Sequence, residues 1–343
     1  MMRIIDIRKY KNEEEIRKKL SPAAKSIKSG DLVVIPTETV YGLAGDCFNV
    51  SAVNKIFLVK NRPYSDPLIV HISNFEQLSC IVKSLPEEAK RIIDNFWPGP
   101  VSLVLQKNAR VPDIVTAGLD TVCVRMPELN VTREFITQCG TPLAAPSANI
   151  FSRLTSTDLQ HILKYFKNKK EVKYTIYAGR TKYGIESTVV DCTTEPFRVL
   201  RYGAVEVEKI METCRIKIVE SKRVYRRKSP GMMKKHYSPA KIMYLSGDLI
   251  KYIRRLSKED LRKITFVCSN KTKEEIYKFV KNDISVVPYG NELREIAQNL
   301  YLCLHIAEEM DTEVIVAEVP KNVNGLGKTI YDRLVKASSN KWV

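Results

Sequence analysis

Four short segments carry residue types that could bind an anionic ligand. They are 36–42 (PTETVYG), 60–63 (KNRP), 146–149 (PSAN) and 186–191 (ESTVVD). They combine basic, hydroxyl and amide side chains with glycine and proline, which form turns at strand ends. Together they predict a pocket for a triphosphate and a small polar substrate, in which we expect the cations to have no acidic neighbours.

The basic pair in the second segment is Lys60 and Arg62, which flank Asn61. In an extended segment both side chains would point to the same side and could bind a triphosphate. The Arg62 guanidinium could bind two phosphate oxygens at once. The alternative is a basic helix end that complements the helix dipole.

Small polar side chains follow two apolar strands. Thr39 comes shortly after the strand expected at 32–35, and Ser147 and Asn149 come after the strand expected at 143–145. Open α/β sheets usually bind ligands at the carboxyl ends of their strands. Stabilisation of ordinary turns is the alternative role for these side chains.

Further candidates lie within or at the ends of strands. Arg125 and Arg201 each end an apolar strand and could bind a carboxylate or phosphate, or lie on the surface. Ser187 opens a strand, so its hydroxyl is no obvious helix cap. His71 lies in an apolar run, where a core histidine is the more usual outcome.

Several catalytic motifs are absent. The segment 325–329 (GLGKT) resembles the end of a phosphate-binding P-loop, but the motif needs glycine where Asn322 stands. The chain has no Gly-x-Ser-x-Gly elbow, His-Glu-x-x-His motif or cluster of paired carboxylates. Chemistry would therefore rest on positioning and charge neutralisation.

The composition narrows the class of protein. The 343 residues carry a formal net charge of +17, which favours phosphate-bearing partners such as nucleotides or RNA. The eight cysteines form no Cys-x-x-Cys pair, so we expect buried free thiols and no zinc site. There is no apolar run long enough to span a membrane and no signal peptide, so we expect a cytoplasmic protein.

We expect two α/β domains joined by a linker. Residues 1–214 mix strands and helices without strict alternation, which predicts a mixed sheet with helices on its faces. Residues 215–241 hold ten Lys or Arg and one acid and predict a basic linker that docks on another part of the protein. Residues 242–343 alternate strand and helix, which predicts a small Rossmann-like domain with four or five parallel strands.

The expected elements follow from apolar periodicity and turn residues. In the first domain they are helices at 12–29, 50–60 (capped by Ser51), 74–84, 86–96 and 156–167, and strands at 32–35, 67–72, 101–105, 121–125, 143–145, 174–178, 187–192 and 197–201. In the second domain they are strands at 242–245, 264–268, 284–288 and 314–317, and helices at 248–256, 272–281, 291–310 and 326–338.

The chain also resembles a known family. The four segments above, with 67–71 (PLIVH) and 199–203 (VLRYG), resemble the YrdC-like domain of the threonylcarbamoyl-AMP synthase family. The segments 229–239 (SPGMMKKHYSP), 325–327 and 332–334 resemble the longer, two-domain form of that family. The resemblance implies a YrdC-like twisted mixed sheet, a Rossmann-like second domain and a linker that closes over the pocket as a lid.

The resemblance also implies a reaction. L-threonine and bicarbonate form N-carboxythreonine, which attacks the α-phosphate of ATP, carried with Mg²⁺, and releases pyrophosphate. No protein side chain is implied as a direct metal ligand. A separate transferase complex would use the adenylate to modify the tRNA adenine next to the anticodon.

Site residues are carried over by motif. Catalysis is implied for Lys60 and Arg62. The implied ATP-binding residues are Lys60, Arg62, Thr121, Ser147, Asn149, Thr155, Arg201, His236 and Tyr237. The implied threonine-binding residues are Thr39, His71, Arg125, Ala145 and Ser187.

Two other functions remain open from the residues. A basic protein that binds double-stranded RNA or tRNA without synthase activity would bind in a salt-sensitive way and release no pyrophosphate. Carbamoyl transfer in hydrogenase maturation uses a similar YrdC-like unit, but the zinc-binding Cys-x-x-Cys segments of that family are absent here.

Overall fold

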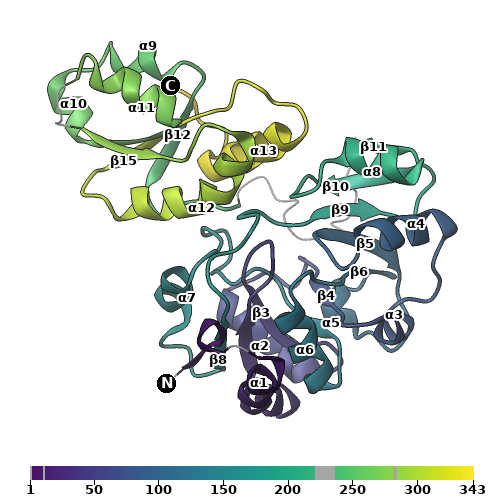
Figure 1. Ribbon diagram of the computed structural model, residues 1–343. Helices are drawn as coiled ribbons and strands as arrows, with labels where there is room; N and C mark the ends of the chain where they lie inside the picture. Colours follow the sequence, from purple (N-terminus) through teal and green to yellow (C-terminus); the bar gives the residue numbers. More distant parts are fainter. Residues whose placement is uncertain (1, 11, 221–235, 281–283) are drawn as a thin grey trace. The chain divides into compact units, whose positions relative to one another are not determined.

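The computed structural model describes residues 2–10, 12–220, 236–280 and 284–343. It divides into two compact units, drawn in purple to teal and in green to yellow in Figure 1. Of the described residues, the first unit holds most of those up to 220, and the second holds those from 236 onward. Two short segments from the first part of the chain, 152–155 and 183–185, also belong to the second unit.

The first unit is built on a mixed sheet of eleven strands among the described residues. In spatial order the strands are β1 (Arg3–Asp6), β8 (Val172–Tyr177), β2 (Leu32–Ile35), β3 (Gly42–Asp46), β7 (Leu143–Ala144), β4 (Ile69–His71), β6 (Thr121–Arg125), β5 (Val101–Gln106), β9 (Thr188–Asp191), β10 (Phe197–Arg201) and β11 (Ile218–Glu220). Both parallel and antiparallel pairs occur, which confirms the mixed sheet.

Two helices cover one face of the first half of this sheet. Helices α1 (Glu13–Lys28) and α6 (Asn130–Cys139) pack against each other and bury Val33, Ala44 and Leu143 from the strands beneath them. Leu143 pairs with His71, so the same face continues beyond β7 onto β4. There it carries a small apolar cluster around Ile69, Cys123 and Val189, with buried polar side chains beside it that include several candidate site residues.

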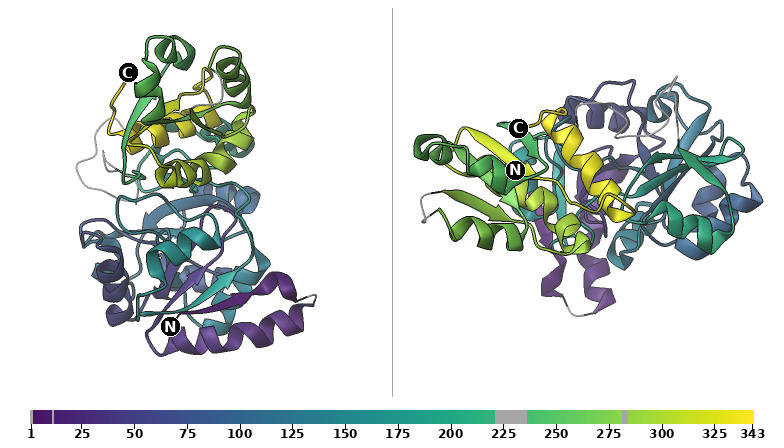
Figure 2. Two further views of the ribbon diagram at one scale, coloured as in Figure 1. Left: turned by 90° about the vertical axis from the view of Figure 1, so that its left-hand side faces the viewer. Right: turned by 90° about the horizontal axis from the view of Figure 1, so that it is seen from above.

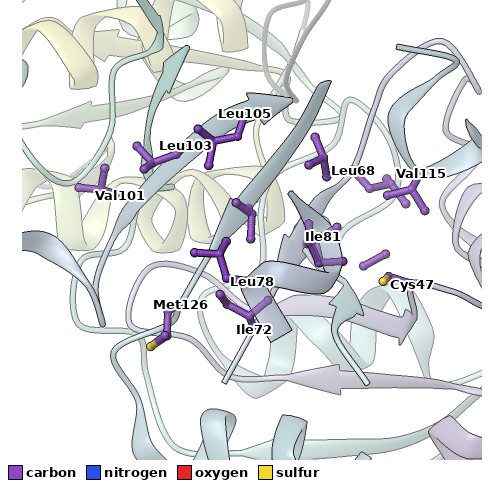
Figure 3. Close-up of a cluster of buried hydrophobic side chains, with 14 of the residues drawn as sticks. Cys47, Leu68, Ile72, Leu78, Ile81, Val101, Leu103, Leu105, Val115 and Met126 are labelled. Carbon is purple, nitrogen blue, oxygen red and sulfur yellow. The ribbon is translucent and has the colours of Figure 1, made fainter. Parts of the chain in front are cut away.

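The opposite face holds the main apolar core of the first unit. Alternate residues of its strands, such as Leu103 and Leu105, point into this core, part of which Figure 3 shows. The helices that bury side chains in it are α2 (Val50–Lys60), α3 (Phe75–Ile81), α4 (Glu87–Phe96), α5 (Asp113–Thr116), α7 (Leu159–Phe166) and α8 (Val207–Cys214). The sheet is thus anchored from this side and leaves part of its other face for chemistry.

The second unit has the parallel sheet that the alternation predicts. Its strands are β12 (Ile242–Ser246), β15 (Val314–Glu318), β13 (Ile264–Cys268) and β14 (Ser285–Pro288), in that order and all parallel. The helices are α9 (Leu249–Ile253), α10 (Lys258–Arg262), α11 (Asn270–Tyr277), α12 (Leu293–Glu309) and α13 (Leu326–Ser338). Figures 1 and 2 show α9 and α11 on one face of this sheet and α12 and α13 on the other.

Some local expectations were wrong. Helix α2 is capped by Asn49, whose side chain accepts from the Ala52 amide, and not by Ser51. Part of the expected linker, 218–220, is strand β11 of the first sheet, where it pairs with β10. The linker motif 229–235 lies outside the described residues. Within the described ranges, no helix combines the length and the apolar character that crossing a bilayer requires.

Candidate functional site

The expectation that the basic side chains have no acidic neighbours was wrong. Arg62 Nη2 lies 2.9 Å from the Asp66 carboxylate, and both side chains are buried. Arg125 Nη1 lies 3.4 Å from Glu38 Oε1, in a pair that is also buried. A buried charge is costly without a partner, so each acid offsets the desolvation of its arginine. The acids also fix where the two guanidinium groups lie.

The sequence leaves two geometries open for residues 60–62, an extended segment or a basic helix end, and the structure has the helix end. Lys60 is the last residue of α2, and Asn61 ends the helix in the left-handed region with φ of 52°. This reversal directs Arg62 onto the loop that follows. Arg62 donates from Nε to the Asp66 carbonyl at 3.0 Å and from Nη2 to the Pro67 carbonyl at 2.8 Å.

Lys60 joins the end of α2 to the loop after β7. Its buried Nζ donates to the carbonyl oxygens of Ser147 and Asn149, and the Ser147 hydroxyl donates to Asn149 Oδ1 at 2.6 Å. Burial, and then the positive charge of Arg62, hold the pKa of Lys60 well below that of a free lysine. The structure therefore brings Lys60, Ser147 and Asn149 into one cluster, as the sequence predicts.

The polar half-face of the sheet collects a second group. His71 on β4 pairs with Arg125 on the parallel strand β6. Ser102 on β5 and Arg201 on β10 both pair with Val189 of β9, and Ser187 lies two residues before it. Because residues two apart share a face, Thr121 lies on this half-face with Arg125. Strands far apart in the sequence thus present their polar residues to one side.

Three buried atoms on this half-face have no hydrogen-bond partner within the described parts of the chain. They are Nδ1 of His71, Nε of Arg125 and the hydroxyl of Thr121. Buried polar atoms of folded proteins are almost always satisfied. The group could therefore donate to a polar ligand such as a carboxylate or phosphate.

The hydroxyl of Thr39 is tied to this group. Arg125 Nη1 donates to Thr39 Oγ1 at 2.9 Å, and Thr39 Oγ1 lies 2.8 Å from Thr37 Oγ1. Ala145 directly follows strand β7, and its amide donates to the Ile69 carbonyl of strand β4 at 2.9 Å. Of the five residues for which the resemblance implies threonine binding, Thr39 and Arg125 are in contact and His71 lies opposite Arg125 on the neighbouring strand. Ala145 is joined to the strand of His71 through its backbone, and Ser187 contacts Ser102 and Arg201 instead.

His71 is held neutral by its surroundings. Burial, and then the charge of Arg125, hold the pKa of His71 well below its usual value of 6.5, against an opposing hydrogen bond with the Ile69 carbonyl. The unfolded chain therefore binds a proton that the folded chain does not, at pH values between the folded pKa and 6.5. Stability from this residue is present above pH 6.5 and is lost as the pH falls.

We predict that the stability of His71→Asn falls less steeply with decreasing pH than that of the wild type. The free energy of unfolding of the wild type should fall more steeply than that of the variant below the unfolded pKa, by at most about 1.4 kcal/mol per pH unit. Urea unfolding of both proteins between about pH 5 and 7.5 measures the difference. Parallel curves would show that His71 titrates normally in the folded protein.

Arg201 and Ser187 form a third contact group. Arg201 donates from Nε to the Ser187 carbonyl at 3.1 Å and from Nη2 to the Ser187 hydroxyl at 2.9 Å. The hydroxyls of Ser187 and Ser102 lie 2.7 Å apart. Gly203 packs so closely on this strand that a Cβ added to it would lie 2.3 Å from the Ser187 carbonyl carbon.

We predict that Gly203→Ala displaces Ser187. Because the new methyl group would meet backbone, the start of β9 must move. We expect threonine affinity to fall by about tenfold, the effect of about 1.4 kcal/mol. Calorimetric titration with L-threonine measures it. Gly247→Ala is the matched control, since a Cβ there meets nothing within 4 Å, and equal losses in both variants would contradict the prediction.

Three of the expected residues belong to the second unit. Thr155 lies in the segment 152–155, and His236 and Tyr237 begin the described part after the gap. The rings of His236 and Tyr237 contact each other edge to face, and Arg333 lies over the Tyr237 ring, 4.9 Å from its centroid. These residues are described with the second unit, below.

Sequence reasoning missed the residues that support the site. Glu38, Asp66 and Ser102 are buried against the predicted side chains. Asp66 carried a usable signal, because an acid four residues after an arginine in a loop can pair with it. Glu38 and Ser102 carried none, because their partners are distant in the sequence.

Two protein-family models match this chain, one in each part of the sequence. Residues 25–203 match the Sua5/YciO/YrdC family model, described as telomere recombination. Residues 205–339 match the model described as the C-terminal domain of threonylcarbamoyl-AMP synthase. The chain belongs to the threonylcarbamoyl-AMP synthase family.

Relatives in this family match over nearly the whole chain. The threonylcarbamoyl-AMP synthase of Pyrococcus abyssi is 39% identical over 98% of this chain and 97% of its own. That of Bacillus subtilis is 31% identical over 94% of this chain and 93% of its own. The two-domain form of the family, which the linker and C-terminal motifs indicate, is thereby confirmed.

A solved structure of the family matches the fold. The crystal structure of P. abyssi Sua5 complexed with L-threonine has a TM-score of 0.87 and 34% identity, and covers 100% of this chain and 99% of its own. This confirms the predicted fold class, a YrdC-like mixed sheet followed by a Rossmann-like domain.

Proposed function

We propose that this protein is an L-threonylcarbamoyladenylate synthase that uses L-threonine, bicarbonate and ATP. The observation that carries the proposal is the set of buried polar atoms of His71, Arg125 and Thr121 that have no partner among the described residues. Full-length relatives that bear the synthase name support it. The product would serve the modification of a tRNA adenine next to the anticodon, through a separate transferase complex.

We assign ATP to the cluster around Lys60. Lys60, Ser147 and Asn149 already contact one another, and Arg62 is charged and fixed by Asp66 beside them. Thr121 and Arg201 would extend this site along the sheet, and Thr155, His236 and Tyr237 would complete it. Cations that are fixed before the ligand arrives stabilise developing charge without reorganisation.

We assign L-threonine to the donors of the polar half-face. Arg125 would bind a carboxylate, and neutral His71 can donate one N–H without adding charge. Thr39 and Ser187 would bind the remaining polar groups, and the small side chain of Ala145 would leave room for the ligand. A ligand with a carboxylate, such as L-threonine, should therefore bind there more tightly than a similar ligand without one.

The reaction then needs positioning more than proton transfer. The threonine ammonium group first loses a proton to solvent, and the free amine and bicarbonate then give N-carboxythreonine and water. An oxygen of the new N-carboxylate forms a bond to the α-phosphorus of ATP. At the same time the bond between that phosphorus and the oxygen that bridges it to the β-phosphate breaks, and pyrophosphate leaves. Carboxylate and triphosphate repel each other, so Lys60 and Arg62 would lower the barrier by neutralising charge.

Magnesium would arrive with ATP. Mg²⁺ prefers phosphate oxygens and water to an all-protein cage. Among the described residues, no group of three or more His, Cys, Asp and Glu side chains that could hold a metal ion is found. When bound, Mg²⁺ would supply further neutralisation of the triphosphate.

The remaining expectations are also proposals. We propose that the enzyme works in the cytoplasm, where ATP and tRNA are available. We keep residues 1–214, extended by strand β11 (Ile218–Glu220), as the catalytic domain and 242–343 as the C-terminal domain, joined by a linker that would close the site. The basic charge would give weak RNA binding at most, and no membrane is involved.

Pyrophosphate release tests the proposal. The wild type is incubated with ATP, Mg²⁺ and bicarbonate, with L-threonine, with L-serine or with neither. We expect release that requires threonine and is much weaker with serine. Release that is absent or indifferent to the amino acid would contradict it, and salt-sensitive RNA binding without release would favour the RNA-binding alternative.

A further inference from the structure

One stripe of helix α12 contacts three segments of the second unit that contain or directly precede residues assigned to the proposed site. Gln298, Tyr301, His305 and Glu308 are spaced by three, four and three residues, so they share one side of the helix. We call these four residues the α12 stripe. All the segments that it contacts belong to the second unit.

The first of these segments is 152–155, which ends at Thr155. His305 is buried, and its Nε2 lies 3.2 Å from the Thr155 carbonyl oxygen, so it donates a hydrogen bond there. Arg153 Nη2 lies 3.7 Å from Glu308 Oε1. One end of the α12 stripe thus holds both the backbone and a side chain of this segment.

The second segment is 183–185, which leads directly into Glu186 and Ser187. Gly184 has φ of 71° and approaches α12 so closely that a Cβ on it would lie 2.4 Å from the Gln298 carbonyl oxygen. Only glycine fits this conformation and this distance together. The other end of the α12 stripe therefore holds the start of the chain that carries Ser187.

The third segment contains Tyr237. Its ring lies 5.7 Å from the ring of Tyr301, centroid to centroid. The Ala240 amide donates to Glu308, and the Ser238 amide donates to the Ser152 carbonyl at 2.8 Å. The first and third segments are thus bound to each other as well as to the α12 stripe.

We propose that the α12 stripe positions these segments for catalysis, with His305 as the positioning residue for Thr155. The inference rests on the proposed function, because that function gives Thr155, Ser187 and Tyr237 their roles. It assigns the second unit a part in nucleotide affinity through contacts within that unit. His305 acts through the backbone of Thr155 and need not touch the nucleotide.

The test compares His305→Ala with two matched variants. His305→Gln can still donate to the Thr155 carbonyl, and Cys303→Ala removes a buried side chain of α12 that contacts Pro288 instead. Each protein is measured by hydrogen exchange of the peptide covering 152–157 and by calorimetric titration with ATP. Thermal unfolding of all four proteins shows the general loss of stability.

We expect His305→Ala to speed exchange in residues 152–157 and to weaken ATP binding by roughly 5- to 10-fold, the effect of one buried hydrogen bond. His305→Gln should keep most of the exchange protection and most of the ATP affinity. Cys303→Ala should leave both quantities unchanged. Unchanged exchange or unchanged ATP affinity in His305→Ala would overturn the proposal. A wild-type protein that binds no ATP would instead contradict the proposed function, and exchange would still report on the anchoring.

Discussion

Replacing Arg62 with alanine is expected to lower threonine-dependent ATP turnover by about 10²-fold or more, the effect of losing one fixed charge-stabilising donor. The guanidinium is buried and held by Asp66 at 2.9 Å and by two backbone carbonyls. It is therefore already in place when the triphosphate arrives. Steady-state pyrophosphate release at saturating threonine measures the loss.

This substitution needs a control for folding. Removing Arg62 leaves the Asp66 carboxylate buried without its partner, which can cost about 3–5 kcal/mol of stability. The double variant Arg62→Met with Asp66→Leu removes both charges, and such replacements are often neutral for stability. We expect it to be folded and equally inactive. Near-wild-type turnover in the folded double variant would show that Arg62 serves only the local structure.

Replacing Lys60 with methionine is expected to lower turnover by about 10²–10³-fold on the same scale. Methionine keeps an unbranched side chain but removes every N–H donor. The pKa of Lys60 lies well below its free value, because it is buried and lies near Arg62. A bound triphosphate would counter both effects, so ATP binding should bring a proton to Lys60.

This proton uptake separates a role in binding from a purely structural one. Titration with ATP in buffers of different ionisation enthalpy measures protons taken up per site. We expect uptake in the wild type at pH values above the lowered pKa of Lys60, and a smaller value in Lys60→Met. Lys60→Arg is the charge-matched comparison, since arginine remains protonated and should show no uptake at this position. Equal uptake in the wild type and both variants would contradict the role of Lys60.

The elements of the fold were largely predictable because their periodicity is local. Helices α1 and α12 and all four strands of the second sheet follow from apolar spacing and turn residues. Strand β3 was missed because Gly42 and Gly45 lower its strand propensity. Helix α6 was missed because its buried side chains, Phe135 and Ile136 among them, are mixed with polar residues.

The site was predictable in its residues and less so in its geometry. Lys60, Ser147 and Asn149 come together because the end of helix α2 contacts the loop that follows strand β7. The sequence left open whether Lys60 and Arg62 lie in an extended segment or at a helix end, and it could not show that Asn61 adopts a left-handed conformation. Ion pairs such as Arg125 with Glu38 depend on strand order, which local patterns do not encode.

Local sequence patterns also could not predict that Thr155 and Gly184 pack with the second unit. The contacts of His305 with Thr155 and of Gln298 with Gly184 span more than a hundred residues of sequence. A helix stripe at spacing three and four indicates a buried face but not its partner. Such contacts become visible only once the chain is folded.

The most direct test of the central claim is the identity of the product. The protein is incubated with ATP, Mg²⁺, L-threonine and ¹³C-bicarbonate, and the adenylate is analysed by mass spectrometry. The account predicts an adenylate that contains threonine and one ¹³C atom, formed in step with pyrophosphate. A threonyl adenylate without the label, or hydrolysis of ATP with no adenylate, would contradict the account.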